Sequence, residues 1–130
     1  MKISTFAIIL ALLGAFYGIA LLAIPVKFLA NYGVVLDNAG TTMARLLGAI
    51  LFGNSISYWL FRNVSASDKT WRYILIGTII YNAVSIPISA TSVLNGITNS
   101  MGWSTVAVQF LVAVSCAYYL VQIKPEAKVA

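Results

Sequence analysis

Few side chains in this chain could take part in chemistry. Charged residues make up 8% of the 130 residues, histidine is absent, and Cys116 is the single cysteine. The acids are Asp37, Asp68 and Glu126. Without histidine, imidazole ligation of haem or zinc and histidine acid–base catalysis are excluded, and one cysteine forms no internal disulfide. We therefore expect no catalytic residues, no bound metal and no cofactor.

One row of polar side chains stands inside an otherwise apolar segment. Its members follow one another at steps of four, three, four and three residues: Thr78, Asn82, Ser85, Ser89 and Ser92. This spacing places all of them on one face of a helix. At lipid depth such a face must turn toward a bundle interior or a water-filled cavity.

Two interpretations of this row stay open. In the first, the polar groups hold helices together, at about 0.5–2 kcal/mol each. In the second, they line a pocket for a small polar or amphipathic molecule. With a rise of about 1.5 Å per residue, Asn54 and Asn82 fall at similar depth and can bond across an antiparallel pair, while Gln109 falls near Ser85. The candidate polar face comprises Arg45, Asn54, Thr78, Asn82, Ser85, Ser89 and Gln109.

Arg45 is a charged residue placed inside an expected membrane span. It lies one turn from the outer end, where its long side chain can reach the interface. Asp37 is the acidic candidate partner on that side. An anion or lipid headgroup contact is the alternative to this structural role.

Helices that lie in lipid must position the residues of the candidate polar face. Hydrophobic residues make up 61% of the chain and the mean hydropathy is +0.93. A spanning helix needs about 20 mostly apolar residues, and four segments meet this need. We expect an all-α polytopic membrane protein, a single domain of residues 1–130 with four transmembrane helices in an antiparallel bundle. The helices are expected at about residues 5–24, 42–61, 71–94 and 103–123.

The outer loop, residues 25–41, is longer and half apolar. The segment from Val26 to Ala30 is expected to form a short interfacial helix that Gly33 stops. Thr41 or Thr42 is expected to cap the helix that follows.

Basic residues predict the orientation. Six lie on the side of the two termini and the second loop: Lys2, Arg62, Lys69, Arg72, Lys124 and Lys128. Only Lys27 and Arg45 lie on the other side. The positive-inside rule then places both termini in the cytoplasm, most simply of a prokaryotic inner membrane. The net charge of +5 is scattered rather than gathered into a nucleic-acid-binding stripe.

Small residues recur in the first helix. Gly14 and Gly18 are four residues apart, with alanines at the same spacing on an adjoining face. Helices in lipid pack where small residues let their backbones approach. These glycines either pack within the bundle or form a subunit-contact face, and we single out Gly14 and Gly18 as that candidate face.

Two known groups of similar size are disfavoured. Small multidrug exporters resemble the chain in length and helix count, but its first helix lacks their membrane-embedded glutamate. Membrane glutathione and eicosanoid enzymes also have four helices, and their second-helix pattern of Glu, Arg and Asn is absent here.

The segment TTMARLLGAILFGNSISYW resembles the small, functionally uncharacterised four-helix membrane proteins grouped with the DoxX-like families. The resemblance covers about the first 62 residues and depends on Arg45, Gly48, Ala49 and Trp59. It implies a four-helix bundle and carries no activity with it.

For function, we expect a non-catalytic accessory or structural subunit of a larger membrane protein complex. The alternative is a small-molecule or lipid-binding or transport protein that uses the polar row. An enzyme is the least favoured class, because no general base stands inside the membrane. The expected partners are membrane lipids and other transmembrane subunits or a second copy, and no nucleic acid.

Overall fold

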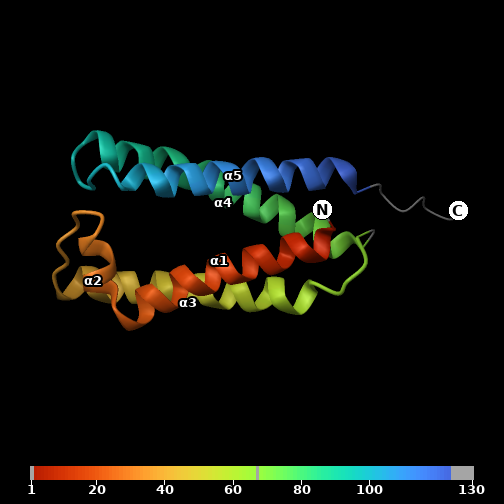
Figure 1. The fold of residues 1–130 in the computed structure, drawn as a ribbon, viewed down its shortest axis with the longest axis horizontal. Coiled ribbons are helices and arrows are strands. Elements are labelled where there is room, and N and C mark those ends of the chain that lie inside the picture. Colours follow the sequence, from red (N-terminus) through yellow and green to blue (C-terminus); the bar gives the residue numbers. More distant parts are fainter. Residues whose placement is uncertain (1, 67, 124–130) are drawn as a thin grey trace, which may run out of the picture. The chain divides into compact units, whose positions relative to one another are not determined.

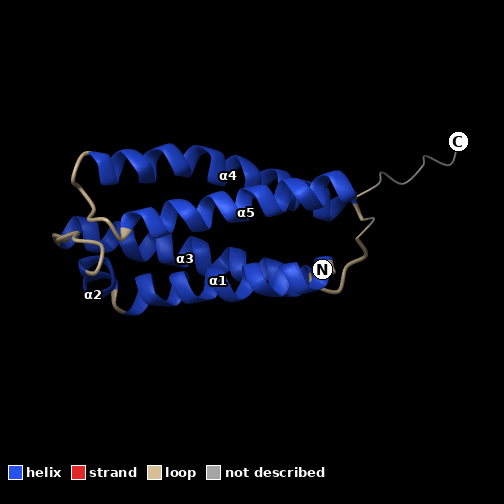
Figure 2. Ribbon diagram, turned by 45° about the horizontal axis from the view of Figure 1, so that its top comes forward, coloured by secondary structure: helices blue, strands red, loops and turns tan. Residues whose placement is uncertain are grey.

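The computed structural model describes residues 2–66 and 68–123. In this part of the chain every regular element is an α-helix, which confirms the all-α class. The helices in chain order are α1 (Ile3–Ala23), α2 (Pro25–Ala30), α3 (Asn38–Phe61), α4 (Lys69–Leu94) and α5 (Gly102–Gln122). Figure 1 shows their order along the chain, and Figure 2 shows the loops that join them. Lys124 and Lys128, which entered the orientation argument, lie outside the described residues.

The start of α3 differs from the sequence prediction. Asp37 is the N-cap, and its carboxylate accepts a hydrogen bond from the amide of Gly40 at 2.6 Å. The hydroxyls of Thr41 and Thr42 instead donate back to the carbonyls of Asp37 and Asn38. The prediction that a threonine caps this helix is therefore wrong, because an aspartate four residues earlier can accept from the first free amides.

The short helix expected within residues 25–41 is present. Pro25 starts α2 at a position where its missing N–H costs no hydrogen bond. The turn that follows ends at Gly33, whose φ of 77° lies in the left-handed region that favours glycine. Edge-to-face contacts of Phe28 with Phe16 and Tyr17, at centroid distances of 6.3 and 5.8 Å, hold α2 against α1.

Two compact units divide the chain, Met1–Val64 and Ser65–Ala130. In the first unit α1 and α3 run antiparallel and side by side, with α2 packed at one end (Figure 1). The seam of α1 is made by residues at steps of four and three: Ala7, Ala11, Gly14, Gly18 and Leu21. This spacing keeps these residues on one face of α1, and that face contacts α3 at Gly14, Gly18 and Leu21.

The second unit is a hairpin of α4 and α5. Its largest fully buried side chains are Trp71, Leu75 and Cys116. Gly102 sits where the hairpin turns, because a Cβ there would lie 2.5 Å from a methyl carbon of Val93 and 2.7 Å from the hydroxyl of Thr98. This close approach leaves no room for a side chain where α5 begins.

Three of the helices, α1, α4 and α5, are long and apolar enough to cross a membrane. They make this an integral membrane protein by length and composition. Helix α3 is 24 residues long, but Arg45 and Asn54 reduce its apolar character.

Candidate functional site

Gly14 and Gly18 lie at the contact between α1 and α3. A Cβ on Gly18 would stand 2.7 Å from the backbone nitrogen of Phe52 and 3.0 Å from the carbonyl of Gly48. A Cβ on Gly14 would stand 3.1 Å from the Cβ of Ser55. The groove that we singled out as a candidate subunit contact is therefore filled by a helix of the same chain. Small residues were required there for the reason expected, close backbone approach, but the partner is internal.

Arg45 and Asp37 have separate roles in the structure. Asp37 caps α3, as described above, so its carboxylate acts on the backbone at the helix start. Arg45 is exposed in the second turn of the same helix. An exposed arginine near a helix end in lipid can extend its guanidinium to the interface.

The side of α3 opposite α1 carries small and polar residues. Ala49, Gly53 and Ser57 follow at four-residue spacing and are exposed. A Cβ built on Gly53 meets nothing within 4 Å. Asn54 lies next to this row and is exposed as well. A small-residue row beside an amide is the combination through which helices associate in lipid.

The polar row of α4 lies on a covered side of its helix. Asn82 is only 4% exposed, and Thr78, Ser85, Ser89 and Ser92 are half-buried. Ile80 and Val84, on the other side of the helix, are exposed. The row thus lies on the less exposed side of α4, as expected of a polar face at lipid depth.

Part of this row is satisfied within its own helix. The Thr78 hydroxyl donates to the carbonyl of Ile74 at 2.8 Å, and the Asn82 amide nitrogen donates to the carbonyl of Thr78 at 2.8 Å. Near the C-terminal end of α4, the Ser92 hydroxyl donates to the hydroxyl of Thr98 at 3.4 Å. These bonds pair donors of Thr78, Asn82 and Ser92 within the hairpin.

Gln109 of α5 differs from the rest of the polar face. Its Oε1 atom is buried, and no hydrogen-bond donor reaches it among the described residues. Counting seven residues inward from the Gly102–Val93 contact places Gln109 opposite position 86 of α4, within a turn of Ser85 and Ser89. A buried acceptor without a donor costs about 1–3 kcal/mol, so this atom is the least explained polar group of the hairpin.

Asn54 and Asn82 belong to different units, and their pairing stays a prediction. The same holds for the assembly of all four long helices into one bundle. The candidate residues fall into two groups. The first group is used for packing or capping within its own unit. The second group consists of the exposed face of α3 and the Oε1 atom of Gln109.

An arginine–tryptophan pair at the end of α3 was not singled out from the sequence. The guanidinium carbon of Arg62 lies 4.2 Å from the centroid of the Trp59 ring. Arg62 also donates through one terminal nitrogen to the carbonyl of Trp59. The signal in the sequence is an arginine three residues after a tryptophan at a helix end, which brings the two side chains together.

Comparison with family models, with curated protein sequences and with solved structures gives no match for this chain. The resemblance to the DoxX-like families therefore stays a prediction from the residues around Arg45.

Proposed function

We propose that this chain is a four-span membrane protein that serves as a non-catalytic accessory subunit of a larger membrane complex. The first step is that α3 also crosses the bilayer. It packs backbone to backbone on α1 from Gly14 to Leu22, which is about 12 Å along the helix axis. Because α1 is apolar enough to span, a helix in such close contact with it lies at the same membrane depth.

The second step is that α3 presents an unfilled face at this depth. Gly53 stands opposite the α1 contact with nothing within 4 Å of its Cβ position, and Asn54 is exposed beside it. A side-chain amide exposed to lipid tails lacks hydrogen-bond partners and is costly. A transmembrane helix of a partner protein that packs on the row Ala49, Gly53 and Ser57 would cover the glycine and bond the amide. This face is the observation that carries the proposal.

A role in assembly also fits the residue types. The helices carry no carboxylate within their expected spans, and a buried nucleophile with an adjacent base is missing from the sequence pattern. At lipid depth the chain has a face of small residues and a few side-chain amides. These features suit helix–helix recognition better than catalysis.

The test replaces Gly53 with isoleucine and uses Gly77→Ile as the matched control. A Cβ on either glycine meets nothing within 4 Å, so neither substitution disturbs the packing of its own unit. We expect Gly53→Ile to reduce the partners that co-purify from native membranes in gentle detergent by about tenfold, since it blocks close approach of a helix. Gly77→Ile should retain them. Equal recovery of partners with both variants would contradict the proposal.

A second candidate is a binding protein for a small polar or amphipathic molecule on the polar row of α4. The unpartnered Oε1 of Gln109 near Ser85 and Ser89 favours it, because a ligand hydroxyl would supply the missing donor. Under this candidate, Gln109→Leu should abolish function while partner recovery is unchanged. Gln122→Leu, on an exposed glutamine at the end of the same helix, is the control.

A further inference from the structure

We infer that the end of the first unit formed by Lys2, Trp59 and Arg62 binds the phosphate group of an anionic phospholipid. The inference does not rest on the subunit role, since it uses a different part of the molecule. It begins with the position of Arg62, directly after the last residue of α3.

Arg62 is held in place and still has free donors. Its guanidinium is stacked over Trp59 and donates one hydrogen bond to the carbonyl of Trp59. A guanidinium has five N–H donors in a rigid fork that matches the oxygens of a phosphate. Because one bond and one stacking contact already fix the group, little rotamer freedom is lost when a phosphate binds.

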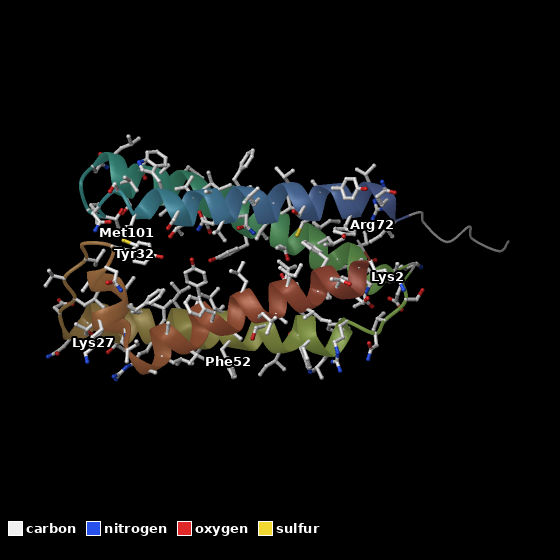
Figure 3. All side chains as sticks on the ribbon, in the orientation of Figure 1. Lys2, Lys27, Tyr32, Phe52, Arg72 and Met101 are labelled. Carbon is white, nitrogen blue, oxygen red and sulfur yellow. The ribbon has the colours of Figure 1, made fainter. Side chains whose placement is uncertain are left out.

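A second cation lies at the same end. Lys2 directly precedes α1, and the antiparallel arrangement brings the start of α1 to the end of α3. Figure 3 shows Lys2 at this end of the first unit and Lys27 at the opposite end. Lys2 is exposed, so its ammonium is free to meet an anion at the membrane surface.

The acid nearest to Arg62 in the sequence is already engaged. The carboxylate of Asp68 accepts a hydrogen bond from the amide of Thr70 at 2.7 Å and caps α4. This hydrogen bonding with Thr70 lowers the pKa of Asp68 below its ordinary value. The carboxylate is therefore charged at neutral pH and hydrogen-bonded to the start of α4, in the other unit of the chain.

The surroundings of Arg62 select a lipid over a free phosphate ion. Trp59 is 45% exposed, and an exposed indole at a helix end is typical of the membrane interface. Ile56, one turn before Trp59, and Leu60, directly after it, are 44% and 66% exposed. A phospholipid can place its phosphate on Arg62 and Lys2 and its acyl chains along these two side chains, which a free phosphate cannot use.

The test measures the phosphatidylglycerol that stays bound to the purified full chain. The protein is exchanged into mixed micelles with equal amounts of phosphatidylglycerol and phosphatidylcholine, and the retained lipids are counted by native mass spectrometry. Removal of one cation near the surface weakens binding of anionic lipid by about fivefold. We expect this loss for Lys2→Gln and a larger loss for Arg62→Gln, with Arg62→Lys intermediate because it keeps the charge but lacks the fork.

The matched controls are Lys27→Gln and Arg45→Gln, which remove the same charge near the other end of the unit. Equal loss of phosphatidylglycerol with these controls, or no preference for it over phosphatidylcholine, would overturn the inference. Release of the lipid by inorganic phosphate at constant ionic strength would also overturn it and assign the cations to a free phosphate. Lys2 stands outside all helices, so Lys2→Gln tests the site even where an Arg62 variant does not fold.

Discussion

The close packing of α1 on α3 in the first unit depends on Gly18 and Gly48. Each of these glycines has a hydrogen atom where other residues have a side chain. A Cβ on Gly48 would lie 2.9 Å from the carbonyl oxygen of Gly18, and one on Gly18 would lie 2.7 Å from the Phe52 nitrogen. These neighbours are backbone atoms, which cannot rotate away. Close approach without a side chain is what allows dispersion contacts between the two helices in lipid.

Gly18→Ala should therefore destabilise the protein. The added methyl group forces α1 and α3 apart, and overpacking of this kind costs about 1–3 kcal/mol. Gly77→Ala, where the Cβ meets open space, should leave the stability unchanged or raise it slightly, because alanine favours the helix. Thermal unfolding in detergent, followed by helical circular dichroism, measures both. Identical melting of the two variants would show that the backbones are not in contact at Gly18.

Asp68 gives a pH-dependent prediction at the same scale. Its pKa is lowered in the folded chain, chiefly by the hydrogen bond with Thr70, from an ordinary value of 3.8. A lowered pKa means that the cap stabilises fully above pH 3.8 and is lost as the pH falls through the lower folded value. Asp68→Ala should thus lower the melting temperature at pH 7 and have no effect at pH values well below 3.8. If the melting temperatures of the unchanged protein and Asp68→Ala still differed at low pH, the role of the Asp68 carboxylate as a cap would be contradicted.

At the scale of the helix, the sequence predicts where each helix lies along the chain better than it predicts what that helix packs against. The apolar segments located all four long helices to within a few residues, because lipid demands continuous apolar length. The start of α3 was missed since Asp37 and two threonines are all good caps, and only the backbone shows which one accepts from the free amides. The covered position of the polar row of α4 followed from its spacing.

What covers a helix face could not be read from the sequence in the same way. A groove of glycines looks alike whether the helix that fills it belongs to the same chain or to another. Gly14 and Gly18 are filled by α3, whereas Gly53 is open. Likewise, the spacing that places Gln109 near Ser85 does not show that its oxygen lacks a donor, since this depends on the rotamer and the local packing.

Gln109→Leu tests that oxygen at the helix scale. Replacing an unpaired buried acceptor with an apolar group of similar size removes a desolvation cost, so the variant should be more stable by about 1 kcal/mol. Gln122→Leu, at an exposed site on α5, should change little. Thermal unfolding of the two variants measures the difference. A lower melting temperature for Gln109→Leu would mean that the oxygen is paired in the folded protein.

At the scale of the whole molecule, the number of membrane crossings determines on which side each terminus and loop lies. Helices α1, α4 and α5 are apolar enough to cross on their own, and α3 crosses in our proposal because it is packed on α1. Four crossings place both termini on the same side, and three place them on opposite sides. The basic residues Lys2, Arg62, Lys69 and Arg72 then stand together on one side only if α3 spans.

The most direct test is the sidedness of three single cysteines at Val35, Ala66 and Asn99 in a Cys116→Ser background. These positions lie in the loops before α3, after α3 and between α4 and α5. A membrane-impermeant thiol reagent applied to intact cells should label positions 35 and 99 and leave 66 unlabelled until the membrane is opened. Labelling of 35 and 66 from the same side, with 99 on the other, would show that α3 does not cross and would contradict the account.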